Sequence, residues 1–372
     1  MTRKKPSPST AHQQLASVVE STAEAIISRS LDGTILTWNA GAERLYGYQA
    51  DEVIGKPVSI LVPENIPRDD LEITKQIGRG ERIGRYITLR RRKDGGTVMV
   101  ELAVSPLKDS RGGVIAVATV CRDITAQESV MSRQREFVSI ASHELRTPLT
   151  ALTGYLSLAT GTDDASQSRV FVDRAYKAAR RLTDLVEDLL QVARLEEDRA
   201  SFAITTVHPD EVVCESVEEL RSQAEHKKIR VSVHSELTKR DAIRVDRTRF
   251  HQVLRNILDN AVKYTPSGGR VSVRSTVRDS GIRIRIRDSG IGIDPQNLNK
   301  IFEKFFREYT ELSVSAGGTG LGMFITKQLV ERQGGSLQVR SRRNAGTTVT
   351  VTFPRAPRPK SVSRGATMQK KK

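Results

Sequence analysis

The sequence has little cysteine and no long apolar run. Its 372 residues include only Cys121 and Cys214, whose separation fits neither a metal site nor a disulfide framework. We therefore expect two free thiols, both buried. No apolar run approaches the roughly 18 residues of a membrane span, and the first ten residues, MTRKKPSPST, lack the apolar core of a signal peptide. These absences predict a cytoplasmic protein without a transmembrane segment.

Acidic residues are missing from both ends of the chain, where much of the net charge of +16 lies. No acid accompanies the seven basic residues after Pro354 or the three at positions 3–5. Such ends are typical of disorder, so we expect disordered basic segments at 1–14 and 356–372. The tail could attract an anionic surface or simply aid solubility. A charge gathered at the ends does not predict specific nucleic-acid binding.

The length predicts two or three domains, and the first is a small α+β unit over 15–126. A strand pair is expected around Asp32-Gly33, because an Asp-Gly pair between alternating apolar residues favours a hairpin turn. Short helical segments should follow. Three more strands are then expected, separated by turns at 94–96 and 110–113.

Long helices are expected over 127–200. A polar, glycine-containing stretch at 159–168 interrupts the pattern and predicts a loop, hence an antiparallel helical hairpin. Two copies forming a four-helix bundle would bury the wide apolar seam, so we expect a homodimer. The seam repeats with alternating spacings of four and three, through Phe171, Ala175, Ala178, Leu182, Leu185, Leu189 and Val192.

Strands and helices mix again over 201–355. An amphipathic helix is expected at 247–265, a hairpin at 270–290, a helix from Gly320 to Gly335 and a final strand near 346–353. In the hairpin, isoleucines alternate with arginines, so one face of the sheet should be buried. The segment predicts an α/β sandwich with helices on one sheet, and the whole chain a multidomain α+β protein.

The stretch SHELRTPL places His143 one turn before Pro148. A proline inside a helix removes a hydrogen bond and costs roughly 3 kcal/mol, so we expect a bend in a helix that continues beyond it. A neutral imidazole is a good phosphoryl acceptor near neutral pH. Glu144 can reach it only by leaning across, because neighbouring residues do not face each other on a helix. Thr147, four residues after His143, lies on the same face of the helix. The plainer alternative for His143 itself is a structural role.

Three further motifs follow, each with a plain alternative of its own. Asn256 and Asn260 lie one helical turn apart, where their amides could enter a common pocket rather than solvent, and an amide oxygen suits Mg²⁺. DSGIGI could be an ordinary turn, or its carboxylate, Asp288, could accept a hydrogen bond from a ligand. Four glycines, at 317, 318, 320 and 322, open a helix, and a helix N-terminus favours phosphate.

Together these motifs resemble a PAS-containing sensor histidine kinase of two-component systems, with a phosphotransfer hairpin at 127–200 and a GHKL-type ATPase domain at 201–355. The resemblance implies that His143 is phosphorylated from ATP with Mg²⁺, that Asn260 holds the metal, and that the partner is a response-regulator receiver domain. It implies a mobile ATP lid between DSGIGI and GGTGLG. It also implies that Glu144 assists the phosphoryl transfer and that Thr147 supports dephosphorylation of the partner response regulator. The implied ATP-binding residues are Asn256, Asn260, Lys263, Tyr264, Asp288, Gly290, Gly292, Arg307, Gly318, Thr319, Gly320, Leu321, Gly322 and Thr347.

Other functions stay open. A GHKL-family ATPase would need a glutamate at the position of Asn256, because an amide cannot act as a base. The other alternative is a PAS-driven signalling dimer whose kinase module is degenerate, or one that works mainly as a phosphatase. The PAS ligand is unknown, although the absence of histidine from 15–125 argues against histidine-ligated haem.

Overall fold

The structure is a computed structural model that describes residues 8–64, 76–77, 79, 81–197, 201–278, 281–308 and 318–357. Most of the expected ATP lid and much of both basic ends lie outside these residues. The chain divides into two compact units, Met1–Glu136 and Phe137–Lys372. Our finer domain boundaries stay predictions. In the described part of the chain, no helix has both the length and the apolar character to cross a membrane.

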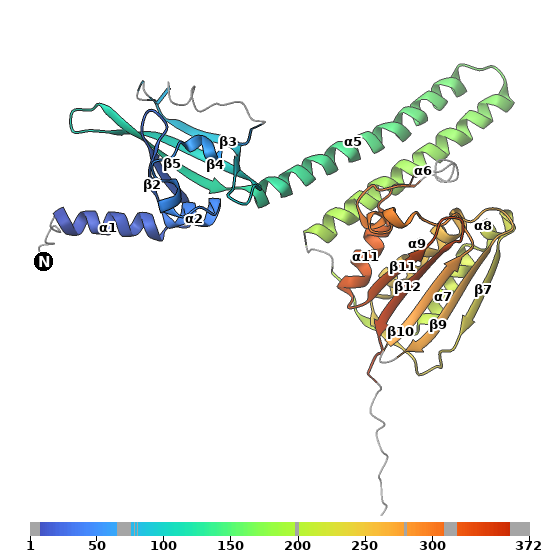
Figure 1. Ribbon diagram of the computed structural model, residues 1–372. Coiled ribbons are helices and arrows are strands. Elements are labelled where there is room, and N and C mark those ends of the chain that lie inside the picture. The colour runs from blue at the N-terminus through green and yellow to red at the C-terminus, as the bar shows by residue number, and fades with distance from the viewer. Residues whose placement is uncertain are drawn as a thin grey trace, which may run out of the picture. The chain divides into compact units, whose positions relative to one another are not determined.

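The first unit is built on an antiparallel sheet with strand order β2-β1-β5-β4-β3 (Figure 1). The expected hairpin at Asp32-Gly33 is confirmed by the pairing of β1 with β2, and the expected meander by β3, β4 and β5. One element differs, because helix α1 begins at Pro8, inside the stretch that we expected to be disordered. The elements are α1 (Pro8–Ser21), β1 (Ala25–Arg29), β2 (Ile35–Trp38), α2 (Ala40–Tyr46), α3 (Ala50–Val53), η1 (Val58–Leu61), β3 (Ile83–Arg91), β4 (Thr97–Lys108) and β5 (Val114–Asp123).

The two cysteines differ in burial. Cys121 lies in the core of the first unit, as expected. Cys214 is exposed, so the expectation of a second buried thiol is wrong. It lies on a helix whose buried face is formed instead by Val212, Val213 and Ser216.

Two long helices, α5 (Thr125–Thr160) and α6 (Ala165–Glu196), run antiparallel as the expected hairpin (Figure 1). Pro148 lies inside α5, so the helix does continue beyond the proline. The connection is shorter than the polar stretch suggested, since Asp164 already caps α6 by accepting from the amides of Ser166 and Gln167. Within the apolar seam, Ala175, Ala178, Leu185 and Val192 are buried.

The rest of the second unit contains a five-stranded sheet of order β11-β12-β10-β9-β7, with β7 and β9 parallel and the other pairs antiparallel, and an antiparallel pair of β6 with β8. The helices α7, α9 and α11 pack on it around one apolar core (Figure 1). Sequence patterning did not reveal α7, α8, β6, β7 or β8. The elements are β6 (Thr205–Val207), α7 (Pro209–Glu219), α8 (Arg221–His226), β7 (Arg230–Ser235), β8 (Ile243–Val245), α9 (Arg247–Lys263), β9 (Arg270–Arg278), β10 (Gly281–Asp288), η2 (Pro295–Asn297), η3 (Lys300–Phe302), α11 (Gly322–Arg332), β11 (Ser336–Ser341) and β12 (Thr347–Pro354).

The expected alternation in the hairpin β9–β10 is present. Ile282, Ile284 and Ile286 are buried against the helices. At the end of β10 this alternation also turns Asp288 inward. A carboxylate therefore lies at the edge of an apolar core, which matters for the site below.

Candidate functional site

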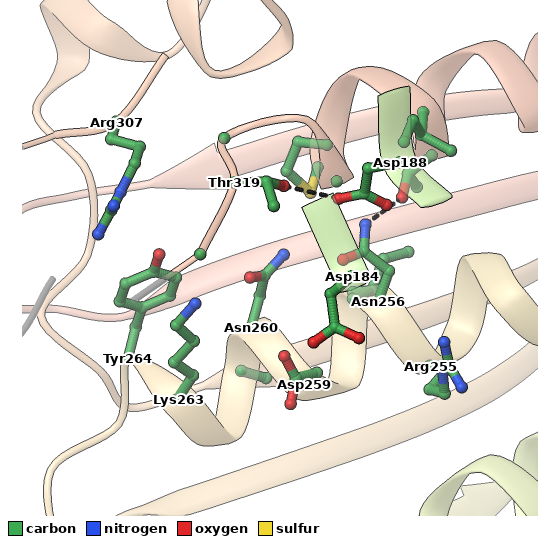
Figure 2. A pocket seen from close by; sticks show the side chains of 18 of the residues that line it. Asp184, Asp188, Arg255, Asn256, Asp259, Asn260, Lys263, Tyr264, Arg307 and Thr319 are labelled. Carbon is green, nitrogen blue, oxygen red and sulfur yellow. Dashed lines mark hydrogen bonds between the residues drawn. The ribbon is translucent and has the colours of Figure 1, made fainter. Parts of the chain in front are cut away.

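A pocket of about 1130 Å³ lies in the second unit, between α9, α11, the end of β10 and the helical hairpin. Figure 2 shows the side chains that surround it. The structure brings most of the predicted residues together here, although His143, Gly290 and Leu321 are not among those that line the pocket. The predicted residues that do line it are Glu144, Thr147, Asn256, Asn260, Lys263, Tyr264, Asp288, Gly292, Arg307, Gly318, Thr319, Gly320, Gly322 and Thr347.

Helix α9 supplies the two amides. Asp246 caps its first turn by accepting from the amide of Arg249 at 3.0 Å, and one face of the helix is buried in the core. Asn256 donates to the Thr326 hydroxyl on α11 at 2.5 Å. In the described structure no side-chain hydrogen bond holds Asn260, which faces the pocket (Figure 2). The two amides thus share a pocket, but the NH₂ group of Asn256 is held by Thr326, whereas in the described structure the side chain of Asn260 is not held by a hydrogen bond.

A cationic group lies at the C-terminal end of α9. The Lys263 Nζ lies 5.4 Å from the centre of the Tyr264 ring. Burial lowers the pKa of Lys263, and repulsion from Arg307 and Arg181 adds to this, while Asp259 opposes it. A Cβ at Gly318, where φ is +125°, would lie 2.6 Å from the Lys263 Nζ. The loop before α11 therefore lies directly against a partly desolvated ammonium, a surrounding that favours an anion.

Asp288 is 9% exposed at the end of β10. Its Oδ1 accepts from the amides of Gly290 at 2.8 Å and Thr347 at 3.0 Å. Burial nevertheless raises its pKa, the two amides opposing the shift. In the described structure, the second carboxylate oxygen accepts no hydrogen bond. A carboxylate oxygen without a partner beside a pocket is well suited to accept from an N–H or amine donor of a ligand.

The glycine-rich loop before α11 is held through the Thr319 hydroxyl. The Thr319 hydroxyl accepts from the amide of Leu321 at 3.2 Å and donates to Asp188 of α6 at 2.7 Å, as the dashed line in Figure 2 shows. Burial raises the pKa of Asp188, and the Thr319 hydrogen bond opposes this. The side chain of Leu321, for which a role at the nucleotide stays a prediction, is fully buried at the N-terminus of α11.

His143 is 75% exposed on α5, outside the pocket. Its Nδ1 lies 3.8 Å from Glu144 Oε1, so Glu144 does lean across to the ring. The Thr147 hydroxyl donates to the His143 carbonyl at 3.3 Å. Glu144, Thr147 and Pro148 reach the wall of the pocket, so the helix that carries His143 faces it.

Sequence reasoning missed the part that α6 plays in the pocket. Six charged side chains on this helix line it: Arg174, Lys177, Arg180, Arg181, Asp184 and Asp188. All but Arg180 are spaced by three and four residues, in parallel with the apolar seam, and this spacing is the signal that could have revealed them. The described residues contain no cluster of three or more histidine, cysteine or acidic side chains able to hold a metal.

Comparison with known proteins assigns three domains. Residues 13–124 match the PAS fold, 133–198 the His Kinase A phospho-acceptor domain, and 245–357 the histidine kinase-, DNA gyrase B- and HSP90-like ATPase domain. The last match implies ATP binding.

Two curated relatives align along almost the whole chain. Sensor histidine kinase WalK of Bacillus subtilis is 30% identical over 92% of this chain and 55% of its own length. Phosphate regulon sensor protein PhoR of Pseudomonas aeruginosa is 28% identical over 90% of this chain and 74% of its own. The solved mycobacterial sensor histidine kinase MprB matches 42% of this chain and 99% of its own at 32% identity, with a TM-score of 0.37. The chain thus spans about half the length of WalK.

Proposed function

The chain belongs to the sensor histidine kinases of two-component systems, with a PAS fold, a phospho-acceptor domain and an ATPase domain, and from this premise we propose that it phosphorylates itself on His143. ATP is the donor, and the phosphoryl group then passes to an aspartate of a response-regulator receiver domain. One observation carries the proposal. The pocket that holds Asn260, Lys263 and Asp288 is also lined by Glu144 and Thr147, the neighbours of His143 on α5.

Asp288 is proposed to recognise the adenine. Its Oδ1 is occupied by two backbone amides, and this fixes the carboxylate so that the other oxygen can accept from the exocyclic amine. At the other end, Lys263 and Arg307 offer positive charge to the phosphates, and the amides of the loop before α11 can donate to them. Charge neutralisation and alignment are the main contributions a protein makes to phosphoryl transfer.

Asn260 is proposed to hold Mg²⁺. The amide is free of hydrogen bonds in the described structure, and a neutral oxygen donor fits a cation that keeps several waters and binds phosphate oxygens. When bound, Mg²⁺ would neutralise charge on the triphosphate. Asn256 is less free to reorient, because its NH₂ group donates to Thr326. It is also an amide where a GHKL-family ATPase needs a glutamate base, which weighs against that alternative.

At His143 the unprotonated ring nitrogen forms a bond to the γ-phosphorus, while the bond from that phosphorus to the bridging oxygen breaks and ADP leaves. The Glu144 carboxylate lies close to Nδ1 and is placed to favour the tautomer with the proton on Nδ1. Nε2 is then the unprotonated nitrogen that attacks. The histidine then loses this phosphoryl group to the carboxylate of the receiver domain. Dephosphorylation of that partner with the help of Thr147 stays a prediction.

A homodimer is proposed for the hairpin. Large apolar side chains of α5 and α6 remain exposed in the single chain, and a second hairpin would cover them in a four-helix bundle. Those more than 40% exposed include Val138, Leu149, Leu156, Leu158, Val170, Val172, Val186 and Leu190.

The test uses the full chain, γ-labelled ATP and Mg²⁺. We expect labelled protein whose phosphate is labile in acid and stable in alkali, as a phosphohistidine is. His143→Gln should abolish labelling while leaving ATP affinity, measured by titration calorimetry, within about twofold, because the ring lies outside the pocket. Labelling that persists in this variant would refute His143 as the acceptor.

A further inference from the structure

Lys227, which follows α8, directs its side chain at the C-terminal end of α9. Its Nζ lies 2.9 Å from the carbonyl oxygen of Val262, 2.8 Å from that of Lys263 and 3.1 Å from that of Thr265. The three contacts use all three donors of the ammonium. Burial lowers the pKa of Lys227, and nearby Asp259 opposes the shift.

These carbonyls lie at and just beyond the C-terminal end of α9. The last carbonyls of a helix have no partner within the helix and carry the negative end of its dipole. In α9 that end belongs to the turn that bears Lys263 and Tyr264, both of which line the pocket. A negative helix end beside a triphosphate would be unfavourable, and the ammonium of Lys227 neutralises it.

Lys227 also fixes the course of the chain beyond the helix. Its own carbonyl accepts from the amide of Gly268 at 3.1 Å and from the Ser267 hydroxyl at 2.8 Å. The Tyr264 carbonyl in turn accepts from the amide of Ile291 at 3.2 Å, in the turn that follows Asp288. Lys227 thus anchors residues 262–268, and a separate backbone hydrogen bond, from Ile291 to Tyr264, joins this segment to the carboxylate end of the pocket.

We propose that Lys227 is a positioning residue for the nucleotide, and that its charge on the end of α9 favours the bound triphosphate. The residue does not line the pocket, so it acts through Lys263 and Tyr264 rather than by contact. The inference rests on the proposed ATP site.

The experiment compares variants of the full chain for ATP and for uncharged adenosine. Lys227→Met should weaken ATP binding by roughly fivefold, the scale of a partly buried helix-end charge, and adenosine binding less. Lys227→Arg keeps the charge and should restore most of the ATP affinity. Lys228→Met is the matched control, because Lys228 is adjacent, exposed and equally charged, and it should bind ATP as the wild type does.

The outcomes separate the inference from its premise. If the wild type binds ATP and Lys227→Met binds it equally well, the inference fails alone. It also fails if ATP and adenosine lose affinity equally while the unfolding temperature drops, since Lys227 would then be only structural. Should Lys227→Met not fold, the same ratio measured on Lys227→Gln decides. Wild-type protein that binds no ATP would overturn the proposed function and this inference with it.

Discussion

Asp288→Asn separates ligand recognition from folding. The asparagine oxygen can still accept from the amides of Gly290 and Thr347, because both bond to the single atom Oδ1. The other oxygen is replaced by an NH₂ group. In the pocket a donor would therefore meet the adenine amine, itself a donor, and the proposed hydrogen bond would be lost.

The expected loss follows from the nature of that bond. A hydrogen bond to a charged group contributes about 2 kcal/mol, so the affinity for ATP should fall roughly thirtyfold. Folding should change little. The pKa of Asp288 is raised by burial, which means that its ionised form is costly in the folded chain, and the substitution removes that cost. We expect the free energy of unfolding to fall by no more than about 1 kcal/mol. Calorimetric titration and chemical denaturation measure the two quantities.

Asp184→Asn is the matched control. Asp184 also lines the pocket, but its side chain is exposed on α6. The same loss of negative charge there should not weaken ATP binding. Equal losses in the two variants would show that charge alone matters, and an unchanged affinity in Asp288→Asn would refute the role given to the carboxylate.

The pH dependence of ATP binding should reflect the ionisation of Asp288. Because burial raises the pKa of Asp288 above 3.8, the folded chain binds this proton more readily than the unfolded chain. The stability that this protonation contributes is fully present below 3.8 and lost as pH rises through the raised value. ATP affinity has the opposite trend and should fall as pH is lowered through that value, since protonation removes the acceptor. Asp288→Asn should lose this component of the pH dependence, and an identical profile in both proteins would contradict the assignment.

Three further predictions concern the surroundings of the pocket. Asn260→Ala should abolish the Mg²⁺-dependent part of ATP binding, and calorimetry with and without Mg²⁺ that shows no difference from wild type would refute the metal role. The side-chain amides of Gln191 on α6 and Gln252 on α9 exchange two hydrogen bonds, of 3.1 and 2.7 Å. A double-mutant cycle to alanine should give a coupling free energy of about 1 kcal/mol. Zero coupling would mean that the pair does not hold the hairpin and the sheet together. A Cβ at Gly346, where φ is +83°, would lie 2.1 Å from the Asp288 carbonyl oxygen, whereas a Cβ at Gly334, where φ is +74°, would meet open space. Gly334→Ala should lower the free energy of unfolding by about 1 kcal/mol, and Gly346→Ala should lower it clearly more. Equal losses would exclude the steric effect.

The local elements could be predicted because their signals lie within a few residues. The Asp-Gly turn, the apolar seam of α6 and the isoleucine–arginine alternation of β10 each specify one element. The exposed Cys214 shows the limit of such reasoning. Whether a side chain is buried depends on which face of its helix meets the core, and a single residue carries no signal of that.

The sequence by itself determined the kind of protein, through the order of its motifs and the periodicity of its helices. Only the tertiary structure decided which side chains meet. Thr319 bonds to Asp188, 131 positions away, and Lys227 caps a helix that ends 36 positions later. Short patterns determine local conformation because neighbouring residues interact directly. Contacts between distant residues depend instead on how the hairpin and the sheet pack, and that is settled by the whole core at once.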